Sequence, residues 1–423
     1  MRGAARAAGP RIDRARARPY NRAVSPSPDA PQKLTRGSRS ILFLTVFIHL
    51  LGFGILIPLL PYYAMKYGAG GVMIGLLNTS FSFAQFLFAP VWGRLSDRVG
   101  RRPVLLGSLL LTGASYVVFA MAQSLPVLFV SRILAGVAGA TLSTALAYVA
   151  DTTGPADRTK GMGLIGAAFG MGFIFGPAMG GVLSRWGFAV PALAAAGLAM
   201  GAAVFAYFRL PESLTPEARA AAGAAGRRRA SFRDAFSRPI VGLVLGLYFT
   251  VTLCFSGMEA ILALFCDHFF RWGPAQIGYL LAYVGVVAAT MQAGIVGSLV
   301  RRFGERALIR TGVFLMGVAF VTAGTVPPIA LFLVVMGVIA VGSGLTSPSL
   351  SGLVSLSTPP AEQGGILGTY QSLGSLARAI GPFLGGLAFD HVSPGAPLWL
   401  AGATLILAVS AALRLPRHED VAT

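Results

Sequence analysis

Apolar stretches of about 20 residues recur along the chain, and their length constrains the fold more than any other feature. A helix of that length crosses the ~30 Å hydrocarbon core of a bilayer. Backbone groups in lipid find hydrogen-bond partners only in helices or closed barrels, and segments this long favour helices. We therefore predict an all-α membrane protein. The twelve predicted spans are residues 41–63, 72–92, 103–122, 126–150, 161–183, 188–208, 240–265, 275–298, 308–326, 329–350, 365–388 and 396–413.

The composition agrees with lipid as the solvent for most of the surface. Hydrophobic residues make up 55% of the 423 residues, charged residues make up 12%, and the mean hydropathy is +0.71. So few charged side chains could not cover a soluble protein of this size. The first span begins too far along the chain, and is too long, for a signal peptide.

Lysine and arginine are distributed very unequally between the two sides of the predicted bundle. The formal net charge of +19 would suggest nucleic-acid binding in a soluble chain. In a membrane protein, the loops that carry basic residues stay in the cytoplasm. Only Lys66, Arg185 and Arg271 fall on the other side, so we predict cytoplasmic termini in the inner (plasma) membrane. Topology and contact with anionic lipid then explain the charge, and we expect no nucleic-acid partner.

The polar segments divide the chain into parts. The first is rich in Arg, Pro and Ser without apolar periodicity, which is typical of a disordered tail. Cys254 and Cys266 match no metal or CxxC motif and are interpreted as packing residues. The predicted parts are a basic cytoplasmic tail (1–40), a six-helix half (41–210), a cytoplasmic linker (211–239), a second six-helix half (240–414) and a cytoplasmic tail (415–423).

Two motifs occur twice. Residues 93–102, Gly-Arg-Leu-Ser-Asp-Arg-Val-Gly-Arg-Arg, recur as Gly-Ser-Leu-Val-Arg-Arg-Phe-Gly-Glu-Arg at 297–306. Residues 176–181, Gly-Pro-Ala-Met-Gly-Gly, recur as Gly-Pro-Phe-Leu-Gly-Gly at 381–386. Because both pairs have nearly the same separation, we predict two pseudo-symmetric halves in parallel duplication, with a substrate cleft between them.

These motifs resemble those of twelve-helix drug:proton antiporters of the major facilitator superfamily, most closely the tetracycline exporters. The resemblance covers residues 42–413 and implies that family's fold, export, and a proton gradient as the energy source. It is carried most specifically by Asp97-Arg98, Gly100-Arg101-Arg102-Pro103, Arg132 with Gly136, Asp151 with Arg158, and Gly176-Pro177.

The resemblance implies that the first motif is a gate that latches the two halves in one conformation. Its glycines allow a tight turn, and Asp97 can accept hydrogen bonds from Arg101 or from a neighbouring helix N-terminus. A solvated basic loop is the alternative. Arg301 replaces the acid in the second copy, so we predict a one-sided latch. The gate residues are Gly93, Asp97, Arg98, Gly100, Arg101 and Arg102, with Asp151 as their implied partner.

The glycine-rich run at 170–177 lies in an apolar span without a preceding strand, which excludes a dinucleotide loop. Small residues let helices approach closely, and Pro177 would kink its helix. The resemblance implies a motif that marks exporters, and generic helix packing is the alternative. The motif residues are Gly172, Gly176, Pro177, Gly180 and Gly181.

Ionisable residues inside the bilayer are candidates for function, because each charge costs at least ~2.5–3.5 kcal/mol at its centre. Counted from the periplasmic ends of their helices at ~1.5 Å per residue, Arg132 lies about 9 Å deep and Glu259 about 10 Å deep. The two side chains could therefore pair across the cleft. Glu259 is the only carboxylate well inside, and a carboxyl alternately buried and paired can carry a proton. A structural salt bridge is the alternative.

His49 completes the candidate proton-coupling set. The resembled exporters carry an aspartate there, before a Gly-x-Gly and Pro element seen here as Gly52, Gly54 and Pro58. Histidine can carry a proton near neutral pH, or simply hydrogen-bond a neighbour. Arg378 could bind an anionic ligand or tie helices together, and we favour the structural role. Other polar residues that could line the cavity or bridge helices are Asn78, Gln85, Gln292, Ser343, Ser347, Tyr370 and Gln371.

The sequence favours a proton-coupled exporter of small amphipathic organic compounds, of the multidrug or tetracycline type. An importer of a polar nutrient such as a sugar would prefer a cavity richer in Asn, Gln and acids. A receptor or scaffold would not need the Asp97 and Arg101 gate. No Ser/His/Asp, metal or phosphate-binding constellation indicates an enzyme. We expect a monomer without metal or cofactor, with a small-molecule substrate, protons and the bilayer as partners.

Overall fold

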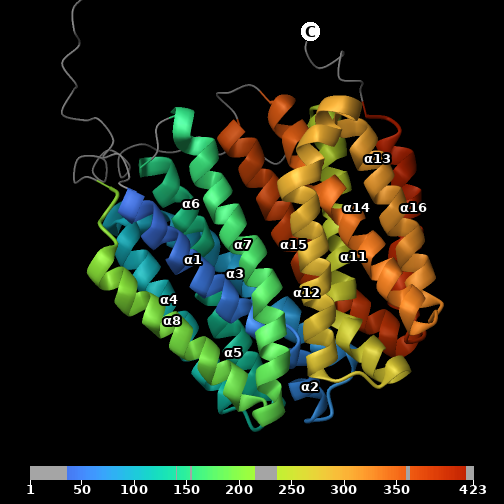
Figure 1. The fold of residues 1–423 in the computed structure, drawn as a ribbon, viewed down its shortest axis with the longest axis horizontal. Helices are drawn as coiled ribbons and strands as arrows, with labels where there is room; N and C mark the ends of the chain where they lie inside the picture. Colours follow the sequence, from blue (N-terminus) through green and yellow to red (C-terminus); the bar gives the residue numbers. More distant parts are fainter. Residues whose placement is uncertain (1–35, 140, 153–154, 215–235, 359–362, 416–423) are drawn as a thin grey trace, which may run out of the picture.

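The computed structural model describes residues 36–139, 141–152, 155–214, 236–358 and 363–415. Its regular secondary structure is entirely helical over these residues (Figure 1), which confirms the all-α prediction for them. The predicted N-terminal tail lies almost entirely outside the described residues, as does most of the predicted linker. The main helices are α1 (Arg36–Leu56), α2 (Leu59–Met65), α3 (Gly71–Val99), α4 (Arg101–Ala120), α5 (Leu125–Val137), α6 (Thr141–Thr152), α7 (Pro155–Leu183), α8 (Ala189–Arg209), α11 (Pro239–Phe270), α12 (Pro274–Thr290), α13 (Val296–Gly324), α14 (Ile329–Leu356), α15 (Gln363–His391) and α16 (Ala396–Ala412).

The helices follow the predicted spans closely, since long apolar segments satisfy their backbone groups internally. Among the described residues, eight helices are long and apolar enough to cross a membrane, and three shorter apolar helices accompany them. The structure differs from the prediction where a span is interrupted. The span at 41–63 is interrupted at residues 57–58, between α1 and α2, and the span at 126–150 divides into α5 and α6.

Two further predicted spans run into one another. The span at 275–298 comprises α12, a wider turn at Met291–Ile295 and the start of α13. The helix α13 then continues into the span at 308–326, with a change of direction at Gly304, whose φ is 75°. Gly100 has the corresponding place between α3 and α4, with a φ of 111°. Both conformations lie in the region that glycine adopts readily.

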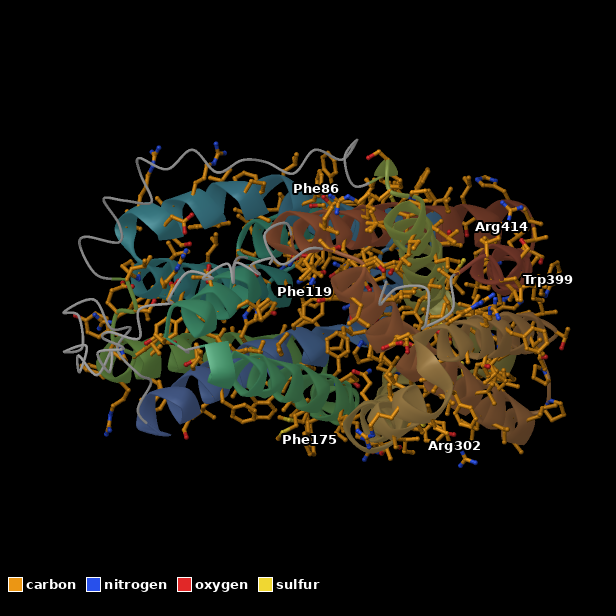
Figure 2. All side chains as sticks on the ribbon, turned by 90° about the horizontal axis from the view of Figure 1, so that it is seen from above. Phe86, Phe119, Phe175, Arg302, Trp399 and Arg414 are labelled. Atoms are coloured by element: carbon orange, nitrogen blue, oxygen red, sulfur yellow. The ribbon has the colours of Figure 1, made fainter. Side chains whose placement is uncertain are left out.

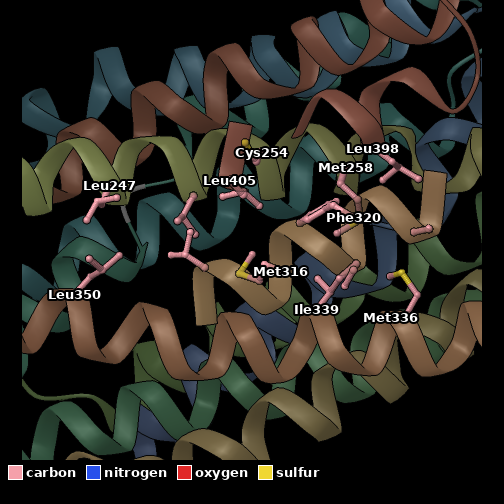
Figure 3. Packing of buried hydrophobic residues seen from close by; sticks show 14 of the residues in the cluster. Leu247, Cys254, Met258, Met316, Phe320, Met336, Ile339, Leu350, Leu398 and Leu405 are labelled. Atoms are coloured by element: carbon pink, nitrogen blue, oxygen red, sulfur yellow. The ribbon is translucent and has the colours of Figure 1, made fainter. Parts of the chain in front are cut away.

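The helices form two groups (Figure 1). Helices α1 to α8 contact mainly one another, and helices α11 to α16 do the same. The main contacts between the groups are α3 with α15 and α7 with α12. The interior of the second group is a large apolar cluster in which Met258 of α11 packs with Phe320 and Ile339 (Figure 3).

Aliphatic and aromatic side chains also cover the outside of both groups. Phe175 and Trp399 lie at the rim of the molecule (Figure 2), with 50% and 42% of their surfaces exposed. A lipid environment explains such exposure, because a soluble monomer rarely exposes large contiguous apolar patches.

The close approaches between the groups are concentrated near one end of the molecule. This end carries α2, which lies at the bottom of Figure 1, and we call it the α2 end. There the hydroxyl of Tyr62 donates a 2.6 Å hydrogen bond to the carbonyl oxygen of Trp272. The opposite end carries Arg101 and is called the Arg101 end. Helices α7 and α12 lie side by side near the α2 end and diverge towards the Arg101 end (Figure 1).

Arginines at the Arg101 end bind the last turn of each group. Arg102 donates to the carbonyl oxygen of Tyr207 at the end of α8. In the second copy of the motif, Arg306 donates to the carbonyl oxygen of Leu413, after α16, at 2.9 Å. A cation at a helix C-terminus also interacts favourably with the helix dipole. Each group therefore holds its own final helix through its own copy of the motif.

Candidate functional site

Arg101, the first residue of α4, is the centre of the predicted gate. Its Nη1 lies 2.6 Å from the carboxylate of Asp97, and its Nε donates to Oδ2 of Asp151 at 2.9 Å. Nη1 also donates to the hydroxyl of Ser96 at 2.6 Å. Only 6% of Arg101 is exposed. One buried guanidinium thus joins α3, α4 and α6 of the first group.

Glu212 joins this cluster from the chain that follows α8. Its carboxylate accepts hydrogen bonds from the backbone N–H groups of Arg101 at 2.8 Å and Arg102 at 3.2 Å. It therefore caps the N-terminus of α4. Ser213 donates to Asp151 at 3.4 Å. The sequence analysis missed Glu212 by assigning it only to the linker.

The remaining gate residues lie at the surface or in the turn. Arg98 is exposed, and Gly93 has open space where a side chain would be. Arg301, which stands in the second copy where Asp97 stands in the first, is exposed. No ion pair is found for Arg301 in the part of the chain that the structure describes. The one-sided latch stays a prediction.

The predicted export motif lies where α7 packs against α1. Three of its glycines, one turn apart, face the backbone of α1. A Cβ added at Gly176 would lie 2.7 Å from the Cα of Gly54. Because that distance is shorter than any ordinary contact, side chains larger than hydrogen would push the helices apart. The facing residues are Leu50 for Gly172, Gly54 for Gly176 and Ile55 for Gly180.

The other face of the same motif meets α12 of the second group. A side chain at Gly278 would overlap the carbonyl oxygen of Pro177. A Cβ at Gly181 would lie 2.9 Å from the carbonyl oxygen of Pro274. The motif therefore holds α7 against its own group on one face and against the other group on the second face.

The second copy of the Gly-Pro element makes the same two kinds of contact in α15. Gly381 faces Gly257 of α11, within its own group. A side chain at Gly75 of α3 would overlap the carbonyl oxygen of Pro382, across the interface. In the contact of Gly278 with Pro177 the proline comes from the first copy of the motif, and in the contact of Gly75 with Pro382 it comes from the second copy. The two contacts across the interface are therefore equivalent.

The interface at the α2 end also contains polar contacts that the sequence analysis missed. The carboxylate of Asp390 in α15 accepts hydrogen bonds of 2.8 Å from the backbone N–H groups of Gly71 and Val72. The hydroxyl of Thr79 donates to the carbonyl oxygen of Ala379 at 2.6 Å. No local pattern identifies these partners, because they lie some three hundred residues apart in the chain.

Glu259 lies half-buried in α11, and the cation whose charge acts on it is Arg378 of α15. Arg378 donates to the hydroxyl of Ser375 at 3.3 Å and also acts on Tyr370. The ring of Tyr370 stacks on that of Tyr248, with 3.6 Å between the centroids. Glu259 and Arg378 therefore form the charged part of the interior of the second group.

The predicted pairing of Arg132 with Glu259 is not found in this structure. Arg132 is 4% exposed, and its guanidinium lies 5.1 Å from the centroid of the Phe119 ring in α4 (Figure 2). Equal depth in the bilayer does not bring two helices together. Helix α5 packs on α3 and α4, whereas α11 packs on α15 and α16.

His49 lies in α1, one turn before Phe53. The ring of Phe53 is 5.5 Å from that of Phe81 in α3 and 5.9 Å from that of Phe173 in α7. The Nδ1 atom of His49 is buried and has no hydrogen-bond partner among the described residues. His49 therefore lies close to the aromatic centre of the first group.

The predicted cavity residues differ in their contacts and in their exposure. Asn78 donates to its own helix at Ile74, and Gln85 reaches the carbonyl oxygen of Gly139 at 3.5 Å. Tyr370 is buried against Tyr248. The half-buried members are Ser343 and Ser347, and the exposed members are Gln292 and Gln371.

The arrangement places two carboxylate partners of one guanidinium at the Arg101 end, and the charged residues Glu259 and Arg378 in the interior of the second group. Over the described residues, no group of three or more His, Cys, Asp or Glu side chains that could hold a metal ion is found. Cys254 and Cys266 are buried and unpaired, as a packing role requires.

Comparisons with known proteins agree on one family. A family model described as Major Facilitator Superfamily matches residues 42–294 and 268–423. Tetracycline resistance protein, class C, of Escherichia coli is 33% identical over 88% of this chain and 94% of its own length. Multidrug resistance protein 2 of Bacillus subtilis (strain 168) is 31% identical over 87% of this chain and 92% of its own. The crystal structure of the human organic anion transporter MFSD10 (TETRAN) is 27% identical, with a TM-score of 0.68 over 89% of this chain and 99% of its own.

Proposed function

The chain belongs to the Major Facilitator Superfamily, and from that premise we propose that it is a proton-coupled exporter of small amphipathic organic compounds. It would work by alternating access, with twelve spans arranged as two pseudo-symmetric six-helix halves. The relatives named for resistance to tetracycline and to multiple drugs support export as its direction.

The observation that carries this proposal is the reciprocal contact of the two Gly-Pro helices. Pro177 of α7 meets Gly278, and Pro382 of α15 meets Gly75, so each half braces one helix against the other half. Close packing of small residues at one end allows the halves to rock about that contact. We assign the α2 end to the extracellular side, which makes this a conformation closed to the outside.

Glu259 is our proposed proton carrier, with His49 as the second candidate. The charge of Arg378 acts on Glu259, so a proton that leaves the carboxyl would leave a carboxylate attracted to the guanidinium. A change in that pair can bias the equilibrium between conformations. We expect a monomer in the plasma membrane with both termini in the cytoplasm, driven by the proton gradient without a cofactor.

The test is transport by purified protein in proteoliposomes with and without an imposed pH gradient. The panel contains tetracycline, an amphipathic dye and a sugar. We expect accumulation of the amphipathic compounds only with the gradient, and its collapse when a protonophore is added. Uptake of the sugar alone, or transport of amphipathic compounds that ignores the gradient, would contradict the proposal.

A further inference from the structure

The interior of the first group contains buried polar atoms without partners. Among the described residues, every such side-chain atom that falls within a predicted span belongs to this group. Burying a polar group without a hydrogen bond is unfavourable, so such atoms indicate a ligand or water that satisfies them. The atoms are Nδ1 of His49, Oγ1 of Thr112, Nε and Nη2 of Arg132, and Oγ1 of Thr144.

Arg132 differs from the other residues because two of its nitrogens lack a hydrogen-bond partner. Nε and Nη2 share one edge of the guanidinium, and their N–H bonds point in the same direction. This edge matches the two oxygens of a carboxylate and binds them side-on. The guanidinium carbon lies over the ring of Phe119, 5.1 Å from its centroid, while Nε and Nη2 have no partner among the described residues.

The first group offers no counter-ion for this charge. The predicted spans 41–63, 72–92, 103–122, 126–150, 161–183 and 188–208 contain no Asp or Glu at all. The described acids Asp97, Asp151 and Glu212 lie in the cluster around Arg101. Arg378 differs from Arg132, since its charge acts on the carboxyl of Glu259.

The surroundings of Arg132 are polar on one side and aromatic on the other. Tyr116 of α4 lies near Arg132. Thr112, with its unpaired hydroxyl, precedes Tyr116 by one turn on the same face of α4. Gly52 of α1 leaves room for the Tyr116 ring, whose Cε2 would lie 3.4 Å from a Cβ at that glycine. Thr112, Tyr116 and Phe119 therefore place hydroxyl groups and an aromatic ring on the face of α4 that meets Arg132.

We propose that Arg132 is the receptor for the carboxylate of an amphipathic organic acid, and that such acids are substrates of this transporter. The inference rests on the proposed function, because only 4% of Arg132 is exposed here and access requires the alternation of conformations. Exclusion of water strengthens a bidentate ion pair. The likeness to a structure described as an organic anion transporter is consistent with this class of substrate.

The test compares ligands that differ only in the head group. Binding of 1-pyrenebutyrate, 1-pyrenebutyramide and 1-pyrenebutylamine to the purified full chain in nanodiscs is measured by fluorescence. We expect the carboxylate to bind at least about 10-fold more tightly than the amide. Arg132→Gln should weaken carboxylate binding about 10-fold to 100-fold and leave amide binding unchanged. Arg132→Lys should fall between, since it keeps the charge without the edge.

Matched controls separate this site from the rest of the protein. Arg378→Gln should leave the preference for the carboxylate intact. Arg132→Gln should unfold at the same or a higher temperature than the wild type without ligand, because it removes a buried unpaired charge. Should Arg132→Gln fail to fold, the preference is measured in Arg132→Lys and in Phe119→Leu, which loosens the guanidinium.

Several results would overturn the inference. They are equal binding of carboxylate and amide by the wild type, loss of the preference in Arg378→Gln instead, and displacement of the probe by millimolar inorganic phosphate or by anionic lipid. Gradient-driven transport of the amide and the amine at the rate of the carboxylate would overturn it and leave the proposed function standing. Carboxylate binding that depends on Arg132, without transport of any probe, would refute the proposed function instead.

Discussion

Asp390 caps α3 at Gly71, with 2.8 Å between its Oδ1 and the backbone nitrogen. Its Oδ2 accepts from Val72 at the same distance, so one carboxylate satisfies two N–H groups that a helix N-terminus leaves unpaired. The cap joins the two groups of helices at the α2 end. It must separate whenever that end opens.

Loss of this cap should favour opening of the α2 end. Charge-assisted hydrogen bonds contribute about 1.5–3 kcal/mol each, so Asp390→Ala should raise the open population at least about 10-fold. Asp390→Asn keeps an acceptor and should have a smaller effect. The measurement is the labelling rate of a Thr79→Cys reporter by an impermeant maleimide, in a background without Cys254 and Cys266. The control is His391→Ala, which changes the exposed neighbouring residue. Equal labelling rates in all variants would refute the role of the Asp390 cap in holding the α2 end closed.

The contact of Gly75 with Pro382 should tolerate no side chain. Gly75→Ala places a methyl group against a backbone carbonyl, and overpacking of this kind costs about 1–3 kcal/mol. We expect a lower unfolding temperature or faster labelling at Thr79→Cys. Gly278→Ala should behave alike, because it meets Pro177 in the same way. Gly107→Ala, in open space on α4, should change neither quantity. A neutral Gly75→Ala would contradict the tight interface.

Neutralising Asp97 should slow transport without preventing folding or ligand binding. Asp97→Asn leaves Arg101 with Asp151 as its remaining ion-pair partner, so its guanidinium loses one of the two carboxylates with which it pairs. Substrate flux in vesicles is compared with that of Arg98→Gln, which changes an exposed charge in the next residue. Wild-type turnover in Asp97→Asn would refute the gate.

Glu259→Gln should separate exchange from coupling. The glutamine mimics the protonated carboxyl, so downhill exchange of substrate should survive while gradient-driven export is lost. Export at the native rate by this variant would move the proton to His49. In that case His49→Gln should abolish coupling, whereas His49→Asp, which restores the residue of the resembled exporters, should be tolerated.

The apolar pattern was sufficient to locate the helices, because lipid forces each long apolar segment to satisfy its own backbone. The breaks were harder to predict. Pro58 lies in the break between α1 and α2, and Gly139 lies in the turn that follows α5. The repeated Gly-Pro motif correctly indicated tight packing, and the structure adds which helices it packs against.

Side-chain partners in the site were the part that sequence reasoning could not supply. The position of a residue along its helix predicts only its depth in the bilayer. The pairing of Arg132 with Glu259 is not found because it also requires that the two helices are neighbours and that both side chains face each other. Glu212 and Asp390 were missed for a different reason. Each binds backbone N–H groups far away in the chain, and a backbone donor leaves no trace in the sequence.

The hold of Arg102 on the end of α8, repeated by Arg306 after α16, has a consequence for biosynthesis. The first group can close on itself as soon as its last helix leaves the ribosome, before any of the second group has been made. Each group would then enter the membrane as a finished unit, and only the joint between the units would wait for the end of translation. Two separate polypeptides, divided within residues 215–235 and synthesised in the same cell, should therefore find each other and form a working protein.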